Sequence, residues 1–149
     1  MNGKIFIDTN VLIYAHDLDA GKKHTTAVKI IKDIWESKNG VISTQVLQEF
    51  YINVTKKILK TISSMEAREI IRSYMSWEIT ENTPMSIVRA SEIEEKHHIS
   101  FWDALIVVAA YSAKVDKILT EDLNSGQMIE GIFIENPFNF KISDKVKNE

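Results

Sequence analysis

Residues 4–14 read Lys-Ile-Phe-Ile-Asp-Thr-Asn-Val-Leu-Ile-Tyr. The first four residues are apolar or long-chained and rich in strand-forming types, so we predict a β-strand at 4–7. The polar cluster Asp8-Thr9-Asn10 is typical of a helix start, and we predict a helix from there through Tyr14. An acid that directly follows a strand lies at its carboxyl end, where open parallel sheets usually bind their ligands.

Short apolar runs and helical patterns alternate along the rest of the chain. Apolar residues at helical spacing, with hydroxyl groups suited to capping at Thr44, Ser63 and Thr83, predict further helices. These helices are expected near residues 27–35, 44–58, 63–74, 83–97 and 100–110. Strands are expected at 41–42, 77–80, 117–120 and 132–135. The helix near 100–110 is apolar on nearly every side and should be buried.

Strands that alternate with helices predict the α/β class, here a three-layer α/β/α sandwich with a mainly parallel central sheet. The length of 149 residues suits a single domain. We assign that domain to residues 1–140 and expect 141–149 to be a frayed tail. We find no internal repeat, linker or low-complexity tract.

Composition narrows the setting in which the chain acts. It contains no cysteine, which excludes disulfides and thiolate chemistry and favours a reducing compartment, so we expect a cytoplasmic protein. The longest apolar run, Ala104–Tyr111, is shorter than the ~20 residues of a membrane span, and Asp8 interrupts the N-terminal run too early for a signal peptide. The net charge of −3 argues against binding nucleic acid by bulk electrostatics, although an acidic site bridged by metal cations escapes that objection.

Four acids stand where a sheet edge could gather them. Asp8 and Asp122 follow predicted strands, Asp103 lies in the first turn of the buried helix, and Glu49 lies at the border of an inward helix face. Each acid alone could be structural, as a helix cap or as a charge that the helix dipole favours. Clustered carboxylates repel one another unless a cation neutralises them. Oxygen ligands without Cys or clustered His are typical of a hard ion, which here means Mg²⁺ or Mn²⁺.

Four motifs in series resemble one known family. They are Phe-Ile-Asp-Thr-Asn-Val-Leu-Ile at 6–13, Leu-Gln-Glu-Phe at 47–50, Ser-Phe-Trp-Asp-Ala-Leu-Ile at 100–106 and Leu-Thr-Glu-Asp-Leu at 119–123. In order and spacing they are similar to the motifs of the PIN domain. The resemblance covers about residues 3–138.

This resemblance implies a PIN-like fold and a metal-dependent endoribonuclease that hydrolyses RNA phosphodiester bonds. Its catalytic residues and metal ligands would be Asp8, Glu49, Asp103 and Asp122, supported by Asn10 and Thr120. Small PIN proteins are often VapC-like toxins of toxin–antitoxin pairs, homodimeric and silenced by a cognate antitoxin. Glu121 stands beside Asp122, so which of the two faces the site is open.

Two other functions remain open at this point. A phosphatase of the haloacid-dehalogenase type also begins with a strand that ends in Asp, but it needs a second Asp where this chain has Asn10. The other alternative is a non-catalytic module of the same fold that binds RNA or protein. Trp77 and Trp102 could stack on bases, but we favour packing in the core or in a dimer for both.

Overall fold

The computed structural model describes residues 3–140, in which the strands form one sheet in the order β3-β2-β1-β4-β6-β5. Its strands are β1 (Ile5–Ile7), β2 (Gly40–Ser43), β3 (Glu78–Thr80), β4 (Lys117–Leu119), β5 (Met128–Ile129) and β6 (Ile132–Glu135). Neighbouring strands pair in parallel, except for β5 and β6. The mainly parallel sheet is therefore confirmed. The expected frayed tail at 141–149 lies outside the described residues.

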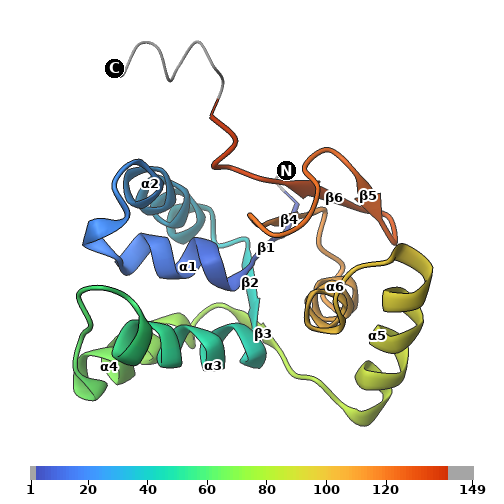
Figure 1. Cartoon of the computed structure of the whole chain (residues 1–149), viewed down its shortest axis with the longest axis horizontal. Helices are drawn as coiled ribbons and strands as arrows, with labels where there is room; N and C mark the ends of the chain where they lie inside the picture. Colours follow the sequence, from blue (N-terminus) through green and yellow to red (C-terminus); the bar gives the residue numbers. More distant parts are fainter. Residues whose placement is uncertain (1–2, 141–149) are drawn as a thin grey trace.

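Helices cover both faces of this sheet. Figure 1 shows α1 to α4 on one side of the strands and α5 and α6 on the other, as the three-layer prediction requires. They are α1 (Thr9–His16), α2 (Lys22–Ser37), α3 (Thr44–Ile52), α4 (Ser64–Tyr74), α5 (Pro84–His97) and α6 (Phe101–Ser112). A short 3₁₀ helix at Leu18–Ala20 precedes α2, and a π-helical turn at Asn53–Lys57 extends α3. Within residues 3–140, no helix has both the length and the apolar character of a membrane span.

The hydrophobic core lies between the sheet and the helices on its two faces, and α6 contributes many side chains to it. Six of the twelve residues of α6 are buried apolar side chains, as predicted from its apolar character on nearly every side. Trp77 is also buried, in keeping with core packing. Trp102 is different, because 64% of its surface is exposed. Packing in the core is therefore wrong for Trp102.

The N-cap of α3 is Ser43, one residue before the predicted cap, Thr44. The side chain that caps α3 belongs to Ser43, whose hydroxyl accepts from the backbone N–H of Val46 at 3.3 Å. Strand β2 continues to Ser43, so Thr44 is already the first helical residue rather than the cap. The predicted caps at Ser63 and Thr83 are both present, each as part of a capping box.

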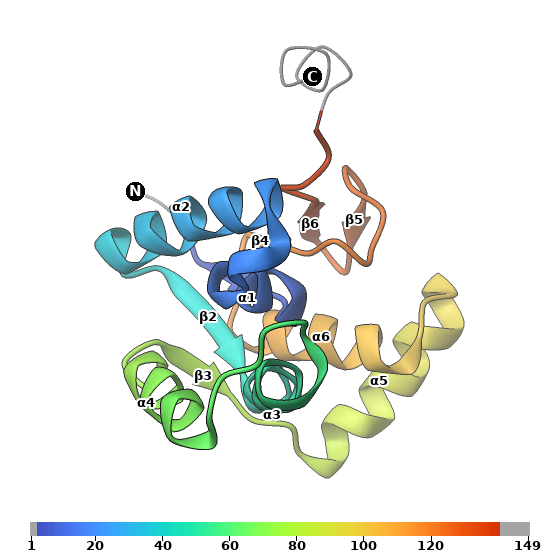
Figure 2. The same cartoon turned by 60° about the vertical axis from the view of Figure 1, so that its left-hand side comes forward.

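A hairpin that the sequence did not predict ends the sheet. Strands β5 and β6 are joined by Glu130 and Gly131, which have φ angles of 50° and 82°. Two successive positive φ values are typical of a type I′ turn, which suits a two-residue hairpin. The Glu130 carboxylate accepts from Arg89 at 3.0 Å, Lys96 at 3.1 Å and His97 at 2.9 Å, all on α5. Figure 2 shows the hairpin at the opposite end of the molecule from α4.

Candidate metal centre

The site begins where β1 and β4 end side by side. The two strands are parallel with Ile7 opposite Leu119, which brings the next residues, Asp8 and Thr120, together. The Asp8 backbone N–H donates to the Leu119 carbonyl at 3.0 Å, and the Thr120 hydroxyl donates to Asp8 Oδ2 at 2.7 Å. Asp8 also caps α1, because its Oδ1 accepts from the Thr9 N–H at 2.7 Å. The first carboxylate is thus buried and held in one orientation.

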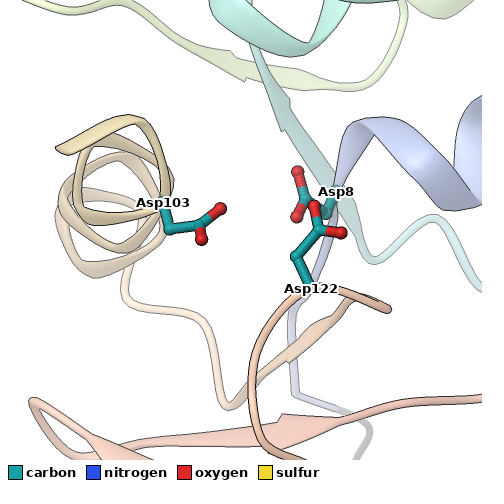
Figure 3. A group of neighbouring side chains, drawn as sticks. All are labelled: Asp8, Asp103 and Asp122. Atoms are coloured by element: carbon teal, nitrogen blue, oxygen red, sulfur yellow. The ribbon is translucent and has the colours of Figure 1, made fainter. Parts of the chain in front are cut away.

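Two more aspartates complete an acidic triad with Asp8. Figure 3 shows Asp122, from the loop after β4, beside Asp8, while Asp103 points toward both from α6. One carboxylate oxygen from each residue lies within 4.8 Å of the others. Ser100 fixes the start of α6, because its hydroxyl accepts from the Asp103 N–H at 3.1 Å. Three segments distant in sequence therefore converge on one point.

Glu49, the fourth predicted acid, lies in the same cleft but outside this triad. Its Oε1 accepts from the Thr9 hydroxyl at 2.7 Å, which turns the side chain toward the end of β1. The cleft has a volume of about 210 Å³, and all four acids line it. Glu49 is therefore placed to contact a molecule bound at the triad, or a water molecule around a cation there. It does not bring an oxygen to the place where the oxygens of the three aspartates meet.

Asn10 contacts both of the acids that follow β4, Glu121 and Asp122, but only the side chain of Asp122. Its Nδ2 donates to Asp122 Oδ2 at 3.0 Å, and its Oδ1 accepts from the Glu121 N–H at 3.2 Å. The Glu121 side chain points elsewhere, to the Tyr14 hydroxyl and to an ion pair with Lys23, both at 2.5 Å. Asp122 is consequently the acid that faces the cleft.

Electrostatics favour a cation at this point. Burial raises the pKa of Asp8 from 3.8 to about 7, and repulsion from Asp122 and Asp103 adds to the effect, against the hydrogen bonds from Thr120 and Thr9. The pKa of Asp103 is also raised, by burial first and then by Asp122 and Glu49. The ionised forms of Asp8 and Asp103 are therefore unfavourable, mainly because both are buried and also because neighbouring acids repel them, and a cation between the acids would stabilise them. A set of ligand oxygens without Cys or His suits Mg²⁺ or Mn²⁺, so the residues fit the expected ion.

Thr9 and Gln45 are among the residues of the cleft that were not predicted as site residues from the sequence. Thr9 holds Glu49, and Gln45 connects α3 to the start of α6 by donating from Nε2 to the Trp102 carbonyl at 3.3 Å. Thr9 belongs to the Asp-Thr-Asn cluster at residues 8–10, in which only Asp8 and Asn10 were predicted as site residues. Gln45 carried no sequence signal, because its role depends on how two helices pack.

Comparisons with known proteins agree with this architecture. The family model of the PIN domain matches residues 5–127. A search of curated proteins gave no significant match. Among solved structures, a toxin–antitoxin complex from Klebsiella pneumoniae superimposes with a TM-score of 0.65 and 18% identity, over 92% of this chain and 100% of that chain.

Two further solved structures have the same fold. DNA-bound VapBC from Salmonella typhimurium gives a TM-score of 0.63 at 18% identity, covering 92% of this chain and 99% of that one. VapC20 of Mycobacterium tuberculosis, described as a toxin that cleaves the sarcin–ricin loop, gives 0.57 at 22% identity, covering 77% and 87%. At such low identity these likenesses concern the fold alone.

Proposed function

This chain belongs to the PIN domain family, and from that premise we propose that it is a metal-dependent endoribonuclease that hydrolyses RNA phosphodiester bonds. The observation that carries the proposal is the convergence of Asp8, Asp103 and Asp122, with oxygens within 4.8 Å, at the carboxyl edge of a parallel sheet. That edge, where the strand order reverses around β1, is the usual place for a ligand in open α/β sheets.

The residues of the cleft divide into ligands and supports. We propose that Asp8, Asp103 and Asp122 hold Mg²⁺ or Mn²⁺. We propose that Glu49 contacts the same cation, or a water molecule on it, from the border of the site. Thr120 and Asn10 orient two of these carboxylates by the hydrogen bonds described above, as groups behind metal ligands commonly do. When bound, the cation lowers the pKa of water and stabilises negative charge that develops on the phosphate oxygens.

The decisive experiment is RNA cleavage with controlled metal content. Purified protein should cut single-stranded RNA with Mg²⁺ or Mn²⁺, and EDTA should abolish the activity. Asp103→Asn and Glu49→Gln should each lose cleavage while keeping the circular dichroism spectrum of the folded chain. The matched control is Glu121→Gln, which neutralises a neighbouring acid that faces Lys23 and should leave cleavage near wild-type level.

Two outcomes would favour the alternatives. Metal-loaded protein that binds RNA but cuts none would support a non-catalytic module. Turnover of small phosphate esters, with a phosphoryl group trapped on Asp8, would support the phosphatase. The place of the second Asp that this phosphatase needs is taken by Asn10, whose amide donates to Asp122, and this favours the nuclease.

We also propose two protein partners for this chain. An antitoxin is supported by the toxin–antitoxin complex and the VapBC structure that share the fold. A second copy is supported by the exposed apolar side chains of Met85, Ile87 and Val88 at the start of α5. Analytical ultracentrifugation at micromolar concentration should give a dimer, and a monomer at every concentration would contradict it.

A further inference from the structure

The indole of Trp102 stands uncovered at the rim of the acidic cleft. It is 64% exposed, precedes Asp103 in the first turn of α6, and lines the same cleft as the acids. Phe101 packs edge-on against it, with ring centroids 5.4 Å apart. An exposed indole beside a site for phosphate groups offers a flat surface on which a base can stack.

Gln45 provides a second, independent observation in this cleft. Its side chain lies almost wholly inside, with 7% of the residue exposed. Because the Trp102 carbonyl can only accept, the amide nitrogen of Gln45 must be the atom that faces it, and Oε1 is the other end. This Oε1 is buried and has no hydrogen-bond partner among residues 3–140. A buried acceptor without a donor is costly, so a ligand N–H would be favoured there.

We propose that Trp102 and Gln45 form a nucleobase subsite of the cleft. The inference rests on the proposed function and deepens it, because it names how the RNA is held. The indole stacks on one base. When the base is bound, a small rotation of the Gln45 side chain uncovers Oε1, which then accepts from an N–H on the edge of that base. The hydrogen bond from Gln45 to the Trp102 carbonyl keeps the acceptor close to the turn of α6 that carries the indole.

The two residues should contribute differently to binding. Stacking tolerates any base, because every base has a π-face, so Trp102 contributes affinity with little selectivity. The acceptor of Gln45 is directional and rewards only a base that presents an N–H at the right place. The nuclease should therefore show a modest preference at one nucleotide, and Gln45 should be its source.

The stacking role is tested with labelled homotrinucleotides of A, C, G and U. Fluorescence anisotropy with Ca²⁺ in place of Mg²⁺, and with the probe checked for integrity, should show Trp102→Ala weakening binding roughly 5- to 150-fold. Trp102→Phe keeps a ring and should retain most of the affinity. Tyr111→Ala removes another exposed aromatic of α6, 52% exposed, outside the acidic cleft, and should bind as wild type does.

Intrinsic fluorescence gives a direct readout of contact. Trinucleotide should quench tryptophan emission in the wild type and not in Trp102→Phe, although the variant still binds. The acceptor role is tested with Gln45→Met, which removes the amide and keeps the length of the side chain. This variant should flatten the affinity differences among the four trinucleotides. Unchanged differences would overturn the role of Gln45.

The outcomes separate this inference from the proposed function. If the wild type cuts RNA but Trp102→Ala binds trinucleotides equally well, the nuclease stands and the subsite is wrong. If Trp102→Ala instead dissociates a dimer without changing trinucleotide affinity, the indole packs against a second copy, and the subsite is again wrong. If no RNA is cut, yet quenching depends on Trp102, the subsite stands on a non-catalytic module.

Discussion

Replacing Asp8 by Asn should stabilise the metal-free protein at alkaline pH while destroying its response to metal. The folded-state pKa of Asp8, about 7, exceeds the ordinary value of 3.8 because the carboxyl is buried. The folded state therefore binds the proton more tightly than the unfolded state, and stability falls as pH rises from about 4 to about 7. Above that window the ionised carboxylate costs roughly 4 kcal/mol, calculated from the difference between these two pKa values.

Asparagine cannot ionise, so it avoids this cost at every pH. It keeps an oxygen for the Thr9 N–H, but the hydroxyl of Thr120 must then accept rather than donate. The hydrogen bond between the introduced asparagine and Thr120 should be weaker than the original one, and this reduces the gain in stability by about 1 kcal/mol. The expected net gain is about 3 kcal/mol at pH 8. Below pH 4, where the wild-type carboxyl is protonated, the substitution should instead cost about 1 kcal/mol.

The assay is urea unfolding followed by circular dichroism, at pH 4 and pH 8, in EDTA and in Mn²⁺. Manganese should raise the stability of the wild type at pH 8 and have little effect on Asp8→Asn, so the order of the two proteins reverses. Glu121→Gln is the control and should respond to manganese as the wild type does. The reasoning is refuted if Asp8→Asn in EDTA at pH 8 is less stable than the wild type, or if Mn²⁺ stabilises both equally.

Three further substitutions test other parts of the structure. Thr120→Val removes the hydroxyl that lowers the pKa of Asp8, so Mn²⁺ affinity measured by calorimetry should fall roughly 10- to 100-fold, and least at high pH. Gly40→Ala places a Cβ 2.7 Å from the Trp77 ring, so thermal unfolding should show a loss of about 1–3 kcal/mol with no change in metal affinity. The pKa of Glu130 is lowered, chiefly by its hydrogen bonds from α5, so its stabilisation is present at neutral pH and is lost as pH falls below 4.5. Glu130→Gln should therefore lower the melting temperature at pH 7 and have much less effect at pH 3.

The acids of the triad could be proposed from the sequence because their positions follow from local rules. Asp8 and Asp122 come directly after apolar runs, and Asp103 opens an apolar helix, so the topology of a parallel sheet brings them to one edge. The choice between Glu121 and Asp122 could not be made locally. It depends on Lys23 of α2, which approaches this loop only in the folded chain and draws Glu121 away.

The missed features depend on packing between distant segments or on very short elements. The bond from Thr9 to Glu49 joins residues forty positions apart, and it requires that α3 lie against α1. The contact of Gln45 with Trp102 likewise requires the ends of α3 and α6 to meet. Strand β5 has only two residues, too few to show an alternating pattern. The hairpin was signalled only by Gly131, whose partner in the turn is a glutamate rather than the usual Asn or Asp.

The strand order has a consequence for synthesis of the chain on the ribosome. Strand β1 is made first, but its second neighbour in the sheet, β4, is made only after residue 116, and Asp122 follows it. A nascent chain whose segment after β4 has not yet left the ribosome contains Asp8 and Asp103 but cannot add Asp122 to them. On the proposed function, a nascent chain therefore gains the ability to cut RNA only when the segment that follows β4 has joined the sheet.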